Sequence, residues 1–531
     1  MFWLDRVYEQ IEKAIPEKLK SGETLLVRDE KTPSGRVHIG NMRSLALHAA
    51  MWERVTEAGI PAVFKFEIND FDPMDGLPVY LDAKEYQQHM GKQLYKIPSP
   101  NPSVAPNFAE YYAKEYIEAI LEAGFKPEFY RASELYLSGK MNEAIRLVLE
   151  KGEVVRKIYK EVSGADRPLN WYALSVVCEN CGRISMTKVT AWDGEKVTYT
   201  CYPTAVKWAE GCGHQGSISP FDGNGKLLWK AEWAAKWFVN GVDLEGGGKD
   251  HYSKGGARDV ARHISAEVFN YPEPFGVQNE YFLFEGEKMS SSKGKGASSK
   301  DVVELVPRHI FRLALFGKDI NQQINFDPTG DMIPVLFDQY DKIAQKYFDG
   351  IEDDDARLFL YVHTPEARAK IEKRFFPRFS EIVFIAQMPH LNLLDEVAKM
   401  KGEPLTEGDV AEAKERARYA LHWLAEYAPE KFVFKLQTEA APESAKNFTS
   451  EQKNALKELL SYVEAHEAPG GQELHTTLHE IRQKSGLSPK DFFGPVYLSF
   501  LGKDHGPKVG WFLSVLDREL VINRIKEVIG L

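Results

Sequence analysis

Cysteine is scarce in this chain of 531 residues: there are four, and all of them lie between positions 178 and 212. This clustering argues against scattered use of cysteine in a core. Apolar runs are also short, well below the roughly 20 residues that a membrane-spanning helix needs, so we expect no membrane partner. No charged stretch followed by an apolar one opens the chain. No secretory signal is therefore indicated, and we expect a cytoplasmic location.

A surplus of basic residues is lacking too. Lys and Arg number 67 against 78 Asp and Glu, which gives a net charge of −11. That balance argues against bulk non-specific nucleic-acid binding, although an acidic protein can still carry a local basic face. Hydrophobic residues at 43% and charged residues at 27% are typical of a globular protein with a large core. The length predicts three or four structural units.

Two short segments carry most of the chemical information. The first is 33–41, Pro-Ser-Gly-Arg-Val-His-Ile-Gly-Asn, between an apolar run at 24–28 and a helical pattern at 42–58. A strand, a glycine-containing turn and a helix N-terminus direct backbone N–H groups and a positive dipole at an anion. The second is 288–294, Lys-Met-Ser-Ser-Ser-Lys-Gly. Its cations, hydroxyls and small residues suit a loop that closes over a triphosphate.

The two segments resemble the HIGH and KMSKS motifs of class I aminoacyl-tRNA synthetases. With the cysteine cluster between them, the chain resembles the class I lysyl-tRNA synthetases, most densely over residues 20–330. Two positions depart from the class-wide pattern. Asn41 stands in place of the final His of HIGH, and Ser291 in place of the second Lys of KMSKS. The cation of that second Lys must then come from elsewhere, and Lys293 or Lys295 is the candidate.

The resemblance also implies roles for individual residues. The implied catalytic residues are His38, Lys288 and Lys293. The turn at 246–251, Gly-Gly-Gly-Lys-Asp-His, resembles a G-x-D-H element that contacts adenosine and the amino acid in related enzymes, although a plain flexible turn is the alternative. The implied ATP-binding residues are Pro33, Ser34, Gly35, His38, Gly40, Asn41, Asp250, His251, Lys288, Met289, Ser290 and Ser291. The implied ligands are ATP with Mg²⁺, L-lysine and tRNA(Lys), and a monomer is expected.

Three tryptophans mark the predicted amino-acid site. Trp229, Trp233 and Trp237 lie at i, i+4 and i+8, one face of a helix, which is typical of a core stripe. The resemblance suggests that one tryptophan lines the amino-acid pocket, and Trp229 is our choice. Asp29, after the strand, could hold the α-ammonium group or be a solvated loop residue, and Glu245 could equally hold the ε-ammonium group. The predicted substrate-binding residues are Asp29, Thr32, Trp229, Glu245 and His251.

The cysteines have the layout of a zinc ribbon. A Cys-x-x-Cys arm is followed by a second pair across a short β-like stretch, and a closed site with four such ligands is structural. Two disulfides or four free thiols are the alternatives. The predicted zinc ligands are Cys178, Cys181, Cys201 and Cys212, with His214 as the substitute if one cysteine is not used.

The order of the patterns predicts the architecture. A strand at 24–28, a helix at 42–58 and a strand at 62–68 form a βαβ unit, so we expect a parallel sheet with ligands at the carboxyl ends of its strands. We predict an α/β fold: a Rossmann-like parallel-sheet catalytic domain with a zinc-ribbon-like insertion, followed by an all-α C-terminal anticodon-binding domain. The predicted segments are the first half of the catalytic domain at 1–77, an insertion at 78–227 with the ribbon at 175–215, the second half at 228–285, the KMSKS loop and stem-contact region at 286–330, and the helical domain at 331–531.

The predicted function is that of a lysine–tRNA ligase. Three alternatives stay open: a class I synthetase for glutamate, cysteine or arginine, a small-molecule nucleotidylyltransferase, and a tRNA-binding paralogue without catalysis. His38, Lys288 and the glycines of the motif argue against the silent paralogue, because such a protein need not keep them.

Overall fold

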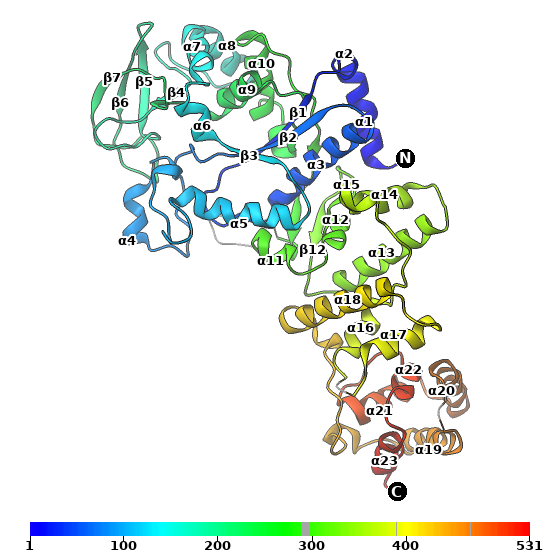
Figure 1. Cartoon of the computed structure of the whole chain (residues 1–531). Helices are drawn as coiled ribbons and strands as arrows, with labels where there is room; N and C mark the ends of the chain where they lie inside the picture. Colours follow the sequence, from blue (N-terminus) through cyan, green and yellow to red (C-terminus); the bar gives the residue numbers. More distant parts are fainter. Residues whose placement is uncertain (288–296, 389, 468) are drawn as a thin grey trace. The chain divides into compact units, whose positions relative to one another are not determined.

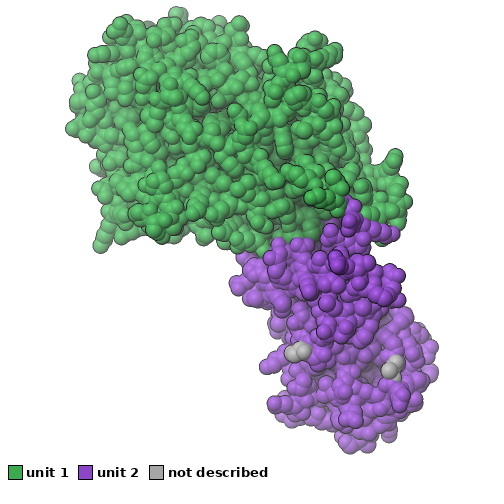
Figure 2. Space-filling view, viewed as in Figure 1, with its two compact units in different colours: residues 1–326, 343–370 green, residues 327–342, 371–531 purple. Residues whose placement is uncertain are grey.

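The computed structural model describes residues 1–287, 297–388, 390–467 and 469–531. The chain forms two compact units, which Figure 2 colours separately. Unit 1 comprises residues 1–326 and 343–370, and unit 2 comprises residues 327–342 and 371–531. Across the described ranges, we find no helix that is both long enough and apolar enough to cross a membrane.

Unit 1 is organised around a parallel sheet (Figure 1). Its named strands, in spatial order, are β1 (Leu25–Lys31), β2 (Ala62–Ile68) and β3 (Glu128–Arg131). On the other side of β1, parallel bridges join Val27 to Leu244 and Leu244 to Phe275. β1 is thus central, and the chain leaves it in both directions, as in a doubly wound sheet whose ligands bind at the carboxyl ends of the strands. This confirms the predicted Rossmann-like fold.

Helices cover this sheet. α3 (Met42–Glu57) connects β1 to β2 and packs on both strands. It has the bounds that the sequence predicted to within one residue, because its apolar positions recur at helical spacing and Gly59 stops it with a φ of 80°. The other helices of unit 1 are α1 (Trp3–Ala14), α2 (Pro16–Lys20), α4 (Ala83–Tyr86), α5 (Phe108–Glu122), α6 (Ala132–Leu137), α7 (Asn142–Glu150), α8 (Gly152–Ser163), α9 (Trp229–Asn240), α10 (Ala257–Glu267), α11 (Ser299–Val303), α12 (Arg308–Phe316), α14 (Asp354–Val362) and α15 (Pro365–Arg368).

Small sheets complete unit 1. An antiparallel sheet of three strands carries the cysteine segment and has the order β5-β6-β7. The strands outside the central sheet are β4 (Leu174–Val176), β5 (Thr187–Trp192), β6 (Val197–Cys201), β7 (Gln215–Ile218), β8 (Gly225–Leu227), β9 (Gly247–Gly248), β10 (Gln278–Asn279), β11 (Phe282–Phe284) and β12 (Ile324–Phe326). β9 pairs with β10, and the 246–251 turn lies near the central sheet because Leu244, just before it, bridges to Val27 of β1.

Unit 2 is helical in its described residues, as predicted for the C-terminal part. Its core contains the buried side chains of Leu459, Leu478, Phe500, Phe512 and Ile525. The helices are α16 (Phe379–Ile385), α17 (Leu393–Lys401), α18 (Glu407–Glu426), α19 (Ser450–Ala465), α20 (Gly471–Ser485), α21 (Pro489–Leu501), α22 (Val509–Ser514) and α23 (Arg518–Ile529), and α13 (Met332–Phe348) begins in unit 2 and ends in unit 1.

Candidate active site

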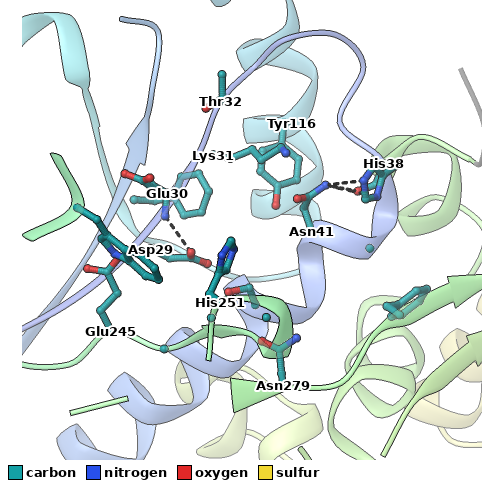
Figure 3. A pocket seen from close by; sticks show the side chains of 18 of the residues that line it. Asp29, Glu30, Lys31, Thr32, His38, Asn41, Tyr116, Glu245, His251 and Asn279 are labelled. Atoms are coloured by element: carbon teal, nitrogen blue, oxygen red, sulfur yellow. Dashed lines mark hydrogen bonds between the residues drawn. The ribbon is translucent and has the colours of Figure 1, made fainter. Parts of the chain in front are cut away.

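A cavity of about 450 Å³ opens at the carboxyl end of β1, where the fold predicts a ligand. Figure 3 shows side chains that line it. The sequence predicted many of these residues: Asp29, Thr32, His38, Gly40, Asn41, Trp229, Glu245 and His251. Glu30, Lys31, Ser44, Tyr116, Trp233, Asn279 and Tyr281 also line it and were missed. Thus one cavity brings together the first motif, the tryptophan helix and the 246–251 turn.

β1 is longer than the sequence predicted. It ends at Lys31, so Asp29 lies within the strand and does not follow it as a loop residue. The register with β2 continues through Lys31 paired with Ile68. Since side chains alternate along a strand, Asp29 and Lys31 share one face, and Arg28 and Glu30 share the other. The prediction of a strand ending at residue 28 was wrong, because three charged residues in a row are typical of a solvated loop.

Asp29 is held in place by its neighbours. Its Oδ1 accepts the backbone N–H of Glu30 at 2.8 Å, and its Oδ2 lies 3.3 Å from Nδ1 of His48. His48 Nε2 accepts the N–H of Gly246 at 2.8 Å, so the ring proton is on Nδ1. That proton is shared with the Ser44 carbonyl, which lies 2.8 Å from Nδ1. His48, from α3, therefore links the end of β1 to the 246–251 turn.

His38 lies at the start of the turn that leads into α3. Burial, and next the nearby charge of Lys31, lower the pKa of His38 to about 4, so the ring is neutral at pH 7. The Asn41 side-chain nitrogen lies 3.3 Å from Nε2 of the same ring and donates to the His38 carbonyl at 3.1 Å (Figure 3). A neutral imidazole can donate a hydrogen bond to an anion without carrying a charge. The pair is thus suited to contact a phosphate group.

Pro33, Ser34 and Gly35, which the resemblance assigns to ATP binding, do not line this cavity. Gly35 has a φ of 156°, and an added Cβ would lie 2.8 Å from the Tyr80 hydroxyl. That hydroxyl accepts the N–H of Arg36 at 2.7 Å. The absence of a side chain at Gly35 thus allows Tyr80 to hold the turn that presents His38.

The three tryptophans of α9 have different surroundings. Trp229 is 38% exposed, Trp233 is 3% exposed, and Trp237 is fully buried. The Trp229 and Trp233 rings stack with centroids 5.1 Å apart, and His251 lies against both, at 6.1 and 5.4 Å. Trp229 and Trp233 line the cavity, whereas Trp237 does not. The aromatic wall therefore consists of two tryptophans and one histidine.

Glu245 has its oxygens occupied by the protein. Trp233 Nε1 and Trp237 Nε1 donate to Oε1 and Oε2 at 2.8 and 2.9 Å. Arg28 adds a third donor, at 2.7 Å from Oε1. These contacts anchor the tryptophan wall. Glu245 also lines the cavity, and its predicted contact with the ε-ammonium group stays a prediction.

Behind Glu30 lies a buried network of ion pairs. Arg28 contacts Glu30, Glu67 and Glu245, and all four side chains are at most 12% exposed. The network contains three cations, Arg28, Lys226 and Lys236, and five carboxylates, Glu30, Glu67, Asp72, Glu232 and Glu245. Carboxylates therefore outnumber cations by two. A buried surplus of negative charge is costly unless a cation from outside balances it.

The residues of the 246–251 turn differ in whether they line the cavity. His251 lines the cavity, whereas Asp250 does not. The Asp250 carboxylate instead accepts the hydroxyl of Tyr281, which does line it. Asp250 is exposed and contacts a cavity-lining residue without lining the cavity itself, so its predicted role in ATP binding stays a prediction. The second motif, including Lys288, Met289, Ser290, Ser291 and Lys293, lies outside the described residues, so its predicted roles stay predictions.

The four cysteines come together away from this cavity. Their sulfur atoms all lie within 4.8 Å of one another. Sγ of Cys178 is 3.6 Å from that of Cys212, and Sγ of Cys181 is 3.7 Å from that of Cys201. These distances are too long for disulfides, and all four thiols are free. His214 is not in the group, and its Nε2 lies 4.0 Å from Glu179.

Two comparisons relate the chain to known proteins. The sequence pattern of the family "tRNA synthetases class I (K)" matches residues 1–366, and that of "Anticodon binding domain" matches residues 377–529. A "Lysine--tRNA ligase" of Methanosarcina barkeri (strain Fusaro / DSM 804) is 31% identical over 99% of this chain and 97% of its own length. One of Thermoplasma acidophilum is 30% identical over 100% of this chain and 99% of its own length. The cavity with its motif turn therefore lies in the matched part of a chain that belongs to the class I tRNA synthetases (K).

Proposed function

We propose that the protein is a lysine–tRNA ligase, which activates L-lysine with ATP and transfers the lysyl group to the 3′ end of tRNA(Lys). The observation that carries the proposal is the composition of the cavity. One side has the His38–Asn41 pair at a helix N-terminus, and another has two tryptophans above a network with surplus carboxylates. The first side suits a phosphate, and the second suits an amino acid that ends in a cation.

In this proposal the lysine carboxylate attacks the α-phosphorus of ATP. One oxygen of the carboxylate forms the new bond, and the bond from the α-phosphorus to the β-phosphate oxygen breaks and releases pyrophosphate. His38 donates to a phosphate oxygen, most strongly as charge develops. Positioning and charge stabilisation dominate such a reaction, since the protein supplies no covalent intermediate.

Asp29 and Glu30 receive the two ammonium groups of lysine. Asp29 is oriented by His48 and takes the α-ammonium group. Glu30 takes the ε-ammonium group: its Oε2 accepts from Arg28 and Lys236, whereas no hydrogen bond to Oε1 is present in the described part of the chain. Trp229 and Trp233 cover the apolar stem. Two further groups favour a polar ligand, since the Tyr116 hydroxyl and Asn279 Oδ1 are buried without a partner among the described residues.

The proposed function involves two metal ions, one bound to ATP and one bound by the cysteines. ATP is proposed to act as its Mg²⁺ complex, as expected for phosphoryl chemistry at these charges. A structural Zn²⁺ fits the four thiols, because tetrahedral zinc with bonds of about 2.3 Å places its sulfur ligands about 3.8 Å apart, close to the observed 3.6 and 3.7 Å. The proposed ligands are Cys178, Cys181, Cys201 and Cys212, with His214 not required.

The remaining partners follow from the same proposal. Unit 2 contains the region matched by the anticodon-binding pattern and is proposed to contact the anticodon arm of the tRNA. The protein is proposed to act as a monomer in the cytoplasm, where aminoacyl-tRNA is consumed. The KMSKS-like segment at 288–294 is proposed to act on the triphosphate with Lys288 and Lys293.

The experiment is ATP–pyrophosphate exchange with each candidate amino acid, with and without a tRNA(Lys) transcript. Lysine should support exchange, and glutamate and arginine should not. Ornithine should be discriminated only by about 1–3 kcal/mol, the usual value of one methylene. His38→Ala should raise the activation free energy by about 3 kcal/mol and so lower kcat, with little change in KM, as for loss of one oxyanion donor. The proposal would be rejected if another amino acid supported exchange in place of lysine, or if no amino acid supported it.

A further inference from the structure

Lys31 is a cation in the cavity wall without an assigned task. It is the last residue of β1, and its side chain is partly buried and lines the cavity. The two lysines of the buried network, Lys226 and Lys236, each pair with at least two carboxylates. For Lys31, the described residues supply neither a hydrogen bond nor an ion pair to the ammonium group.

Two of the carboxylates around Lys31 already have other partners. Asp72 pairs with Lys226 at 2.8 Å and accepts the Thr32 hydroxyl at 2.6 Å. Asp29 is held by His48 and the backbone of residue 30. Burial lowers the pKa of Lys31, and the charges of Asp29, Asp72 and Asp75 only partly offset this. A partly buried cation without a partner is costly, and a bound anion would remove that cost.

Lys31 is directed toward the phosphate side of the cavity. Its charge reaches His38, because it is one of the two causes that lower the pKa of that histidine. In Figure 3 its side chain extends from β1 beside Tyr116, on the side where Asn41 and His38 stand. The ion pairs of Glu30 with Arg28 and Lys236, by contrast, lie on the opposite face of the strand. The ammonium group therefore lies between the amino-acid side and the motif turn.

Activation brings two anions together, the lysine carboxylate and the α-phosphate, so a cation between them is needed. The second motif has Ser291 where the class pattern has a lysine. We propose that Lys31 supplies a cation for this step, with Nζ contacting both the α-phosphate and the attacking carboxylate. This inference rests on the proposed ligase function. Lys31 transfers no proton: the carboxylate–phosphorus bond forms, and the bond to pyrophosphate breaks with its electrons leaving on pyrophosphate.

The test is the exchange reaction with Lys31→Met, which keeps the length of the side chain and removes the charge. We expect kcat to fall about 100-fold, as for loss of one preorganised charge contact, with KM for lysine and ATP changed less than about threefold. Lys31→Arg should recover at least a tenth of the wild-type rate. Lys65→Met is the matched control, because Lys65 is on the adjacent strand, 43% exposed and outside the cavity, and it should leave the rate unchanged.

The melting temperature separates catalysis from structure. Since Lys31 has no ion-pair partner to lose among the described residues, Lys31→Met should be at least as stable as the wild type. A variant that melts earlier and regains its rate under stabilising conditions would overturn the inference, as would one as active as Lys65→Met. A selective rise in KM for lysine with unchanged kcat would overturn it too. A wild-type protein without lysine-dependent exchange would instead reject the proposed function.

Discussion

Glu30 is a cavity carboxylate whose charge changes close to neutral pH. Burial raises its pKa, the cations Lys236 and Arg28 lower it, and Glu67 and Glu245 raise it again, which leaves the value at about 6. Glu30 is thus ionised above pH 7 and increasingly protonated below pH 6. Only the ionised form attracts an ε-ammonium group. KM for lysine should therefore rise as pH falls from 7 to 5, by at most about tenfold per pH unit.

A conservative substitution isolates this effect. Glu30→Gln should bind lysine weakly at pH 7.5, and its KM for lysine should no longer rise as pH falls from 7 to 5. Glu128→Gln is the control, because Glu128 is in the same sheet, 66% exposed and outside the cavity. If KM for lysine still rises at low pH in Glu30→Gln, another group controls lysine binding, and the assignment of the ε-ammonium partner is wrong.

At the scale of single elements, the sequence predicted what depends on local periodicity. β2 has the predicted bounds, 62–68, and α3 ends one residue before its predicted end. β1 was predicted too short because Asp29, Glu30 and Lys31 resemble a solvated turn. Asp29 and Glu30 remain in the strand because His48 and Lys236, which lie elsewhere in the sequence, provide buried partners, and the pairing with β2 continues to Lys31. No local pattern contains that information.

The tryptophan face of α9 has an end that lines the cavity and an end that is part of the core. Trp229→Ala should raise KM for lysine much more than KM for ATP, because Trp229 lines the cavity and is 38% exposed. Trp237→Phe should instead lower the free energy of unfolding by about 1–3 kcal/mol, since it leaves a buried oxygen of Glu245 without its donor. Substrate kinetics and chemical denaturation of both variants distinguish the roles of the two tryptophans.

The contrary pattern would be equally informative for α9. If Trp229→Ala keeps the wild-type KM for lysine and only lowers the melting temperature, Trp229 belongs to the core stripe. The lysine stem would then have to pack elsewhere in the cavity, and Trp233 would be the remaining aromatic candidate.

The cysteine module should depend on its metal. We expect about one zinc per chain, and loss of the metal after Cys178→Ser, together with faster amide exchange at 175–218, because the site supplies folding energy to a small sheet. Ser185→Ala, in the same module, should keep its zinc, since Ser185 is not in the thiol group. Zinc-free protein with four titrating thiols and unchanged stability would contradict the proposal.

The whole molecule has to bind a polyanion although its own charge is −11. The average field of the protein opposes association, so attraction must come from a local set of cations that contact phosphates. Contacts of this kind release counterions, so the logarithm of the binding constant falls linearly with the logarithm of the salt concentration. The salt dependence of KM therefore distinguishes a substrate bound through exposed phosphate contacts from one bound in the buried cavity.

We therefore expect the two substrates to respond differently to ionic strength. For about four phosphate contacts, a fourfold increase in salt should raise KM for tRNA by about 50- to 150-fold. KM for lysine, measured at saturating tRNA, should change far less, because the ion pairs around Glu30 are buried and poorly screened. The measurement is aminoacylation with each substrate varied at several salt concentrations. Parallel salt slopes for lysine and tRNA would mean that salt acts on folding or on the cavity itself, and a flat tRNA slope would exclude a binding mode based on phosphate contacts.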